Sequence, residues 1–221
     1  TVAIPVVADI DTGFGNAVNV HYLLPQFVAA GAAAVTSQNK VLANSKVRIA
    51  VLGVNGRGKD HIAGFGNVPE AEVVCLCDPD LRVARQTASA FETRFNRKVS
   101  IEQDLRKVFE RKDIDALSIA TPNHWHALGT VWACQANKDV YVEKPLSLTV
   151  SEGRRMVQVA AETKRVVQVG IQRRSSKFLQ EAVDYVRSGA LGKISVARGF
   201  HVQNEAPHGI GNAPDSAPPS P

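Results

Sequence analysis

Short apolar runs alternate with amphipathic stretches along residues 46–200 of this 221-residue chain. The runs at Val47–Leu52, Ala71–Cys77 and Ile114–Ala120 are mostly apolar, and the stretches between them have helical spacing. Strands that are apolar on both faces are typical of a parallel sheet covered by helices on each side. Because the connections between parallel strands are right-handed, this pattern predicts an α/β fold with a doubly wound parallel sheet.

The same periodicity predicts the remaining elements. Further strands are expected at Val140–Val142, Val166–Val169 and Ile194–His201, and helices at 58–65, 81–95, 105–110, 124–136 and 176–187. Thr149-x-x-Glu152 is a capping box, which predicts another helix ending near Thr163.

Charge and cysteine content exclude several classes of protein. The net charge is +5, but the basic residues are spread through predicted helices, which favours solvated faces over a nucleic-acid partner. The three cysteines, two of them in one predicted strand, indicate reduced core thiols and a cytoplasmic protein. The sequence contains no run of 18 apolar residues, so no transmembrane helix is predicted. The small apolar segment 28–35 leaves export of a longer precursor open.

Four predicted strands end at residues suited to ligand contact, namely Gly53, Asp78, Thr121 and Glu143. In an open parallel sheet, ligands bind beyond the carboxyl ends of the strands. These four positions therefore predict one shared site along that edge of the sheet.

Gly53-Val54-Asn55-Gly56-Arg57-Gly58 stands between a predicted strand and a predicted helix, where the G-x-G-x-x-G dinucleotide fingerprint occurs. Gly53 and Gly58 hold the first and third glycine positions, and Asn55 occupies the second. Asn tolerates positive φ, so we expect Asn55 to form the turn. With Gly56 and Arg57, the loop would present backbone N–H groups to a pyrophosphate. A plain strand–helix turn is the alternative.

Asp78 ends the second strand, where a carboxylate can accept hydrogen bonds from an adenosine ribose. A carboxylate there would repel a 2′-phosphate, so NAD is the expected cofactor, although nearby Arg82 leaves NADP open. The alternative is an Asp that caps the turn before Pro79.

The segment Thr121-Pro122-Asn123-His124-Trp125-His126 leads from a strand end into a helix. We expect Thr121, Pro122, Asn123 and His126 to border the nicotinamide. No carboxylate or cysteine pattern accompanies the two histidines, so no metal site is predicted.

Glu143-Lys144-Pro145 places a lysine at a strand end. Such a lysine can hydrogen-bond a substrate hydroxyl and assist its deprotonation. Pro145 restricts the preceding residue to extended geometry, which would fix the direction of Lys144. An ordinary surface Lys–Glu pair is the alternative.

Residues 46–205 resemble the Gfo/Idh/MocA (glucose–fructose oxidoreductase / inositol dehydrogenase) family. The matching segments are VRIAVLGVNGRG, CDPD, SIATPNHWHA, VYVEKPLS and VGIQRRS. The resemblance implies a Rossmann NAD(P)-binding domain and NAD(P)-dependent hydride transfer at a carbinol carbon of a sugar, inositol or related polyol. It implies a catalytic Lys144, and cofactor contacts from Gly53, Gly58, Asp78, Glu143, Lys144 and Gln172. Asn55 departs from the commoner glycine.

The resemblance also predicts the domain organisation. Residues 46–170 are expected to form the dinucleotide-binding domain, and 171–221 the truncated start of a second α/β substrate domain with a Pro/Gly-rich tail. Family members carry an Asp-x-x-x-His element in that second domain, and His201 and His208 do not lie in one. We expect a homo-oligomer where the full-length domain is present. The alternative is a cofactor-binding but catalytically inactive fragment or fusion.

Residues 1–45 form a leader and linker. Its segment Ile4–Asn16 resembles a strand and loop of the phosphoenolpyruvate mutase / isocitrate lyase superfamily, in which the positions of Asp9 and Asp11 help to hold Mg²⁺. A single βα unit cannot close the eight-fold barrel of that family. Residues 1–35 are therefore expected to be a detached fragment, with a Mg-dependent mutase or lyase as a minor alternative and an unrelated apolar strand as another.

Overall fold

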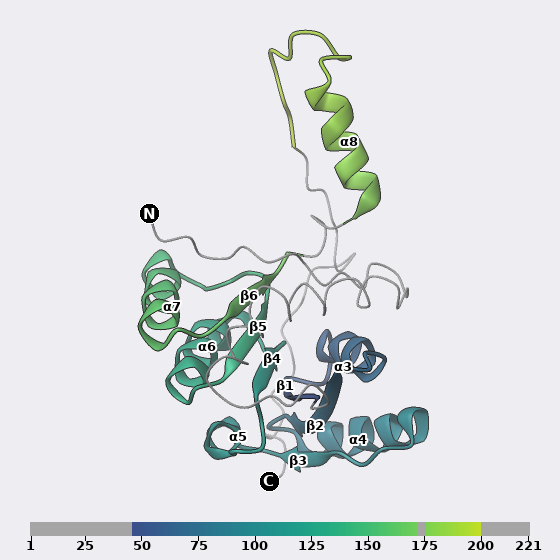
Figure 1. The fold of residues 1–221 in the computed structure, drawn as a ribbon, viewed down its shortest axis with the longest axis vertical. Coiled ribbons are helices and arrows are strands. Elements are labelled where there is room, and N and C mark those ends of the chain that lie inside the picture. The colour runs from purple at the N-terminus through teal and green to yellow at the C-terminus, as the bar shows by residue number, and fades with distance from the viewer. Residues whose placement is uncertain (1–45, 172–175, 200–221) are drawn as a thin grey trace, which may run out of the picture.

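A computed structural model describes residues 46–171 and 176–199 and contains one six-stranded, all-parallel sheet (Figure 1). The strands are β1 (Val47–Leu52), β2 (Ala71–Cys77), β3 (Ser100–Glu102), β4 (Ala116–Ile119), β5 (Asp139–Glu143) and β6 (Val167–Gly170). The helices are α3 (Gly58–Gly66), α4 (Leu81–Phe95), α5 (Leu105–Glu110), η3 (Asn123–Trp125), α6 (His126–Gln135), α7 (Val150–Thr163) and α8 (Lys177–Arg187).

The strand order β3-β2-β1-β4-β5-β6 confirms the predicted doubly wound sheet. β1 pairs in parallel with both β2 and β4, so the chain reverses its winding direction at β1. In sheets of this kind, the crevice beside that reversal is where ligands bind.

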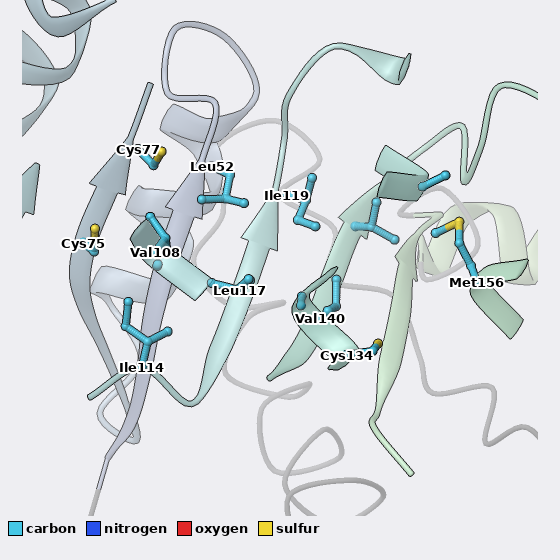
Figure 2. Close-up of a cluster of buried hydrophobic side chains, with 14 of the residues drawn as sticks. Leu52, Cys75, Cys77, Val108, Ile114, Leu117, Ile119, Cys134, Val140 and Met156 are labelled. Atoms are coloured by element: carbon cyan, nitrogen blue, oxygen red, sulfur yellow. The ribbon is translucent and has the colours of Figure 1, made fainter. Parts of the chain in front are cut away.

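Two apolar clusters cover the two faces of the sheet. On one face, Ile49 and Val51 of β1 pack with Phe65 of α3 and Phe91 of α4. On the other, α5, α6 and α7 cover the cluster shown in Figure 2, which includes Leu117, Ile119 and Met156. Figure 1 shows α3 and α4 on one side of the sheet and α5, α6 and α7 on the other. Burial on both faces explains why the strands read as nearly continuous apolar runs.

Local hydrogen bonds start three of the helices. Asp80 accepts hydrogen bonds from the N–H groups of Arg82 and Val83 at the start of α4, and Asp104 accepts one from Arg106 at the start of α5. The predicted capping box of Thr149 and Glu152 is formed at the start of α7. Each cap satisfies backbone N–H groups that have no partner within their helix.

Two predicted elements differ in the structure, and one strand was not predicted. The helix predicted over 124–136 begins as the short 3-10 helix η3 and continues as α6, and the pattern gave no sign of the three-residue strand β3. The strand predicted at Ile194–His201 is wrong for its described part, because residues 194–199 form no strand. Ile194 and Val196 are 52% and 65% exposed. An apolar run becomes a strand only beside a pairing partner, and the described sheet ends at β6.

Some predictions fall outside the described residues, and they stay predictions. These are the leader at 1–45, the proposed contact of Gln172, and the tail that includes His201 and His208. The division into two domains is likewise still a prediction.

Candidate functional site

The carboxyl ends of β1, β2 and β4 border a cavity of about 860 Å³. Its walls include six residues predicted from sequence to contact a cofactor: Gly53, Asn55, Gly56, Asp78, Thr121 and Pro122. The cavity therefore lies at the winding reversal beside β1, where the strand-end pattern placed a ligand.

Gly53 and Gly58 are both required by close approaches of the backbone. Gly53 has φ +80°, and a Cβ there would lie 2.7 Å from the carbonyl oxygen of Ala120. A Cβ on Gly58 would lie 1.8 Å from the carbonyl oxygen of Gly53. By contrast, a Cβ on Gly56 would meet no atom within 4 Å. The first and third glycines thus allow α3 to begin directly against the end of β1.

The prediction that Asn55 forms the turn through positive φ is wrong. Asn55 is exposed, and it is not among the described residues with positive φ. The left-handed step of the loop falls on Gly53, while Arg57 already has right-handed helical geometry at the start of α3. An asparagine is accommodated because this position is exposed at the cavity, rather than because of its tolerance for positive φ.

Asp78 lies at the cavity wall and is buried. Its Oδ2 accepts a hydrogen bond from the N–H of Val54 at 2.9 Å, and its Oδ1 accepts one from the N–H of Asp80 at 3.0 Å. Each carboxylate oxygen has a second lone pair, so these bonds leave acceptor capacity towards the cavity. Asp78 therefore holds the glycine loop in place and can still accept a ligand hydroxyl.

Thr121 and His126 have different positions relative to the cavity. Thr121 lines it, and among the described residues its buried Oγ1 has no hydrogen-bond partner. His126 is 1% exposed and does not line the cavity. Its ring nitrogens contact the carbonyl oxygens of Pro145 and Thr121. This placement does not support the predicted direct contact of His126 with a cofactor and makes it a link between two strand-end loops.

Glu143 is buried and accepts hydrogen bonds from three groups, including the N–H of Lys144. Its Oε1 accepts hydrogen bonds from Arg57 Nε at 2.8 Å and His61 Nε2 at 3.0 Å, and its Oε2 accepts one from the N–H of Lys144 at 3.1 Å. Burial alone would raise the Glu143 pKa, but the hydrogen bonds from His61 and Arg57 hold that pKa at about 2. Glu143 therefore carries a negative charge inside the protein.

Lys144 follows directly after β5, the strand that pairs with β4. Lys144 is exposed, and the Lys144–Pro145 peptide bond is cis. Lys144, Asn123, Arg57, Gly58 and Glu143 do not line the cavity. Arg57 instead spans from Glu143 to Asp60, whose side chain accepts a hydrogen bond from Nη1 at 3.1 Å. Burial would lower the pKa of Arg57, but the hydrogen bonds and charges of Glu143 and Asp60 raise it.

Sequence reasoning missed several residues of this region. The cavity is also lined by Gln103, Asp104, Leu105, Arg106, Trp125 and Trp132. Trp125 and Trp132 stand seven positions apart, a helical spacing that could have indicated a shared face. His61 was missed because its partner Glu143 is distant in sequence.

The described residues contain neither a cluster of metal ligands nor a membrane-spanning helix. No group of three or more His, Cys, Asp or Glu side chains in residues 46–171 and 176–199 is arranged to hold a metal ion. Within the same ranges, no helix is both long enough and apolar enough to cross a membrane.

Residues 47–171, more than half of the chain, match the GFO_IDH_MocA family, described as an oxidoreductase family with an NAD-binding Rossmann fold. The chain belongs to the Gfo/Idh/MocA oxidoreductase family. A scyllo-inositol 2-dehydrogenase (NAD(+)) of Bacillus subtilis is 33% identical to it over 73% of this chain and 46% of the relative. A levoglucosan dehydrogenase of Pseudarthrobacter phenanthrenivorans is 26% identical over 72% of this chain and 41% of the relative.

Solved structures share the Gfo/Idh/MocA fold of this chain. The crystal structure of scyllo-inositol dehydrogenase from Lactobacillus casei with bound NAD(H) and scyllo-inositol has a TM-score of 0.60 and 22% identity. It is matched over 67% of this chain and 43% of that chain. This chain spans about half the length of the curated relatives it matches. At this level of identity, the structural likeness shows the fold alone.

Proposed function

We propose that this chain binds NAD at the strand-end cavity and belongs to an NAD(P)-dependent oxidoreductase that acts on an inositol, sugar or related polyol. The observation that carries the proposal is the cavity at the β1–β4 crevice, with Gly53, Asp78 and Thr121 on its wall. The substrate class is proposed from the relatives, several of which are inositol dehydrogenases.

Three features of the cavity fit a dinucleotide. The open space beside Gly56 gives a pyrophosphate close access to the start of α3, where N–H groups and the helix dipole favour an anion. Asp78 has acceptor capacity for a ribose hydroxyl. The unpartnered Thr121 Oγ1 is a buried polar atom that a ligand would satisfy.

Other lining residues suit the flat base of the cofactor. Trp125 and Trp132 give the cavity aromatic surface, and Leu105 adds an apolar contact. The carboxylate of Asp78 disfavours a 2′-phosphate, which supports NAD over NADP. Arg82 is the residue that keeps NADP open, but its guanidinium pairs with Asp80 and its side chain is 80% exposed.

When bound, the nicotinamide supplies the hydride chemistry. The residues of this chain bind and orient it, and Lys144 would hydrogen-bond the substrate hydroxyl and assist transfer of its proton. Lys144 is suited to this because it is exposed at a strand end, on a peptide whose N–H is held by the buried Glu143.

The proposal extends to the cellular location and the oligomeric state of the protein. Three buried, unpaired cysteines fit a reducing compartment, which supports a cytoplasmic location. We also propose that the full-length enzyme assembles into a homo-oligomer, as the family resemblance led us to expect.

Fluorescence titration with NADH tests cofactor binding, and NADH formation from NAD and a panel of inositols and sugars tests turnover. We expect K144M to bind NADH like the unmodified chain and to lower any turnover by about 10²–10⁴-fold. K98M, which changes another exposed lysine, is the control and should alter neither property. Absence of NADH binding would contradict the proposal. Binding without turnover would favour the alternative of a catalytically inactive cofactor-binding chain.

A further inference from the structure

Four polar side chains, three of them buried, form a hydrogen-bonded network beneath the strand ends, on the face of the sheet that α3 covers. Arg57 donates a hydrogen bond to Glu143, and Glu143 is also hydrogen-bonded to His61. On the other side of the imidazole, His61 Nδ1 lies 2.8 Å from Ser118 Oγ. Ser118, Glu143 and His61 are 0%, 4% and 6% exposed. Buried polar groups are costly unless each has a partner, so a fully bonded set of this kind fixes one arrangement. The proposed hydride transfer does not itself use His61 or Ser118.

The protons in this network can be assigned from its chemistry. An ionised Glu143 only accepts hydrogen bonds, so His61 Nε2 must carry the proton that it donates. In the neutral ring, Nδ1 is then an acceptor, and the hydroxyl of Ser118 donates to it. This tautomer satisfies both ring nitrogens. The edge of Tyr141, with its ring centroid 5.2 Å away, further restricts the orientation of the imidazole.

The network joins the two halves of the candidate site. Arg57 stands at the start of α3, in the loop that would hold a pyrophosphate. At the other end, Glu143 Oε2 accepts a hydrogen bond from the N–H of Lys144. The carboxylate of Glu143 is therefore the shared partner of the glycine loop, the α3 helix and the peptide that carries the lysine.

Glu143 has little freedom to leave this position. A Cβ on Gly170 of the neighbouring strand β6 would lie 3.3 Å from Glu143 Cδ and 2.8 Å from Tyr141 Oη. The backbone of β6 thus lies close against the Glu143 side chain. A shift of Arg57 or α3 would disturb the hydrogen bonds of Glu143, whose carboxylate also accepts the N–H of Lys144.

We infer that His61 and Glu143 are positioning residues that couple occupancy of the glycine loop to the placement of Lys144. The inference rests on the proposed function, since it requires a dinucleotide at that loop. It assigns Glu143 a role different from the direct cofactor contact expected from sequence, because its carboxylate is buried and engaged by protein donors.

The two roles of Glu143 predict different results. A cofactor ligand should lose NADH affinity when changed, whereas a positioning residue should change the environment of Lys144 with little change in NADH affinity. A residue that only stabilises the fold should lower the free energy of unfolding and leave the response of Lys144 to NADH unchanged.

NMR of the chain with ¹³C-methylated lysines gives a readout of Lys144 that does not depend on turnover. K144R identifies the Lys144 resonance, and NADH affinity is measured by fluorescence on each variant. In the unmodified chain we expect NADH to shift this resonance. In E143Q and H61F we expect an NADH affinity within about threefold of the unmodified chain. The NADH-induced shift of the Lys144 resonance should be reduced by about half or more. S118A is a milder variant, which should reduce the shift less, in case H61F does not fold.

H61Q keeps an N–H donor near Glu143 and should restore part of the shift, while H124F, at an exposed histidine outside the network, should leave it unchanged. If NADH binds and its shift of Lys144 is the same in E143Q, H61F and the unmodified chain, the inference is wrong and the proposed function stands. A loss of NADH affinity of about tenfold or more in a folded E143Q would also overturn it, because Glu143 would then be a cofactor ligand. If the unmodified chain does not bind NADH, the proposed function fails and the inference fails with it.

Discussion

His126 Nδ1 lies 2.6 Å from the carbonyl oxygen of Pro145, which fastens the start of α6 to the loop that carries Lys144. Its Nε2 lies 2.9 Å from the carbonyl oxygen of Thr121, at the cavity wall. Both partners are acceptors, so each contact is a hydrogen bond only when the nitrogen concerned carries a proton. One buried imidazole thus connects the loops after β4 and β5, which are adjacent strands of the sheet.

Replacement of His126 by alanine should destabilise the protein. H126A removes the buried imidazole that donates to the carbonyl oxygen of Pro145 or of Thr121, and we expect the free energy of unfolding to fall by about 1–3 kcal/mol. Urea unfolding followed by circular dichroism measures this. The matched control is H124A, which changes an exposed histidine two positions earlier and should cost less than about 0.5 kcal/mol. Equal losses in the two variants would show that the His126 contacts contribute nothing to stability.

Gly58→Ala should damage the glycine loop, whereas Gly56→Ala should leave the fold intact. The added Cβ at position 58 would lie 1.8 Å from the Gly53 carbonyl oxygen, so α3 would have to move away from β1. We expect a cost of about 1–3 kcal/mol or more in thermal unfolding, accompanied by weaker NADH binding. At position 56 the added atom meets nothing within 4 Å. A G58A variant as stable as G56A would contradict the close approach seen here.

Most of the sheet could be predicted because its signals are local. The apolar run Val47–Leu52 and the capping box at Thr149 depend only on neighbouring residues, and both appear as expected. Strand-end positions such as Gly53 and Asp78 could also be placed, since parallel strands bring their carboxyl ends to one edge.

The polar network could not be predicted because its contacts depend on the strand order. His61 and Glu143 are 82 positions apart, and they meet only because β4 and β5 follow β1 in the sheet. The strand expected at Ile194–His201 failed for a related reason. Its apolar alternation is a local signal, but strand formation requires a neighbour that the pattern cannot supply.

The three cysteines should be inaccessible in the folded protein. Cys75, Cys77 and Cys134 are buried and unpaired, and burial raises their pKa values, that of Cys134 to about 11. Few thiolates therefore exist at neutral pH, and a reagent has little access to them. We expect Ellman's reagent to react slowly with the native chain and to detect three thiols after unfolding in guanidinium. Fast reaction of any thiol in the native state would contradict the burial described here.

Ionised Glu143 should stabilise the protein, so the free energy of unfolding should fall when Glu143 becomes protonated at acidic pH. Its pKa is lowered from 4.5 to about 2 in the folded state by His61 and Arg57, against the opposing effect of burial. A group with a lowered folded pKa stabilises the protein above its unfolded pKa, and this contribution is lost as the pH falls through the folded value. The window is therefore between about pH 4.5 and pH 2.

The E143Q variant isolates this contribution from the other carboxylates. Asp104 and Asp113 also have pKa values of about 2, but they titrate in both proteins and cancel in the comparison. At pH 7 we expect E143Q to be less stable than the unmodified chain by an amount on the order of 3 kcal/mol. The difference should shrink as the pH is lowered from 4.5 towards 2, because the unmodified protein loses its ionised Glu143 and the variant has none to lose. Urea unfolding at a series of pH values measures both curves. A difference that stays constant across this range would mean that the Glu143 charge is not what the Arg57 and His61 hydrogen bonds stabilise.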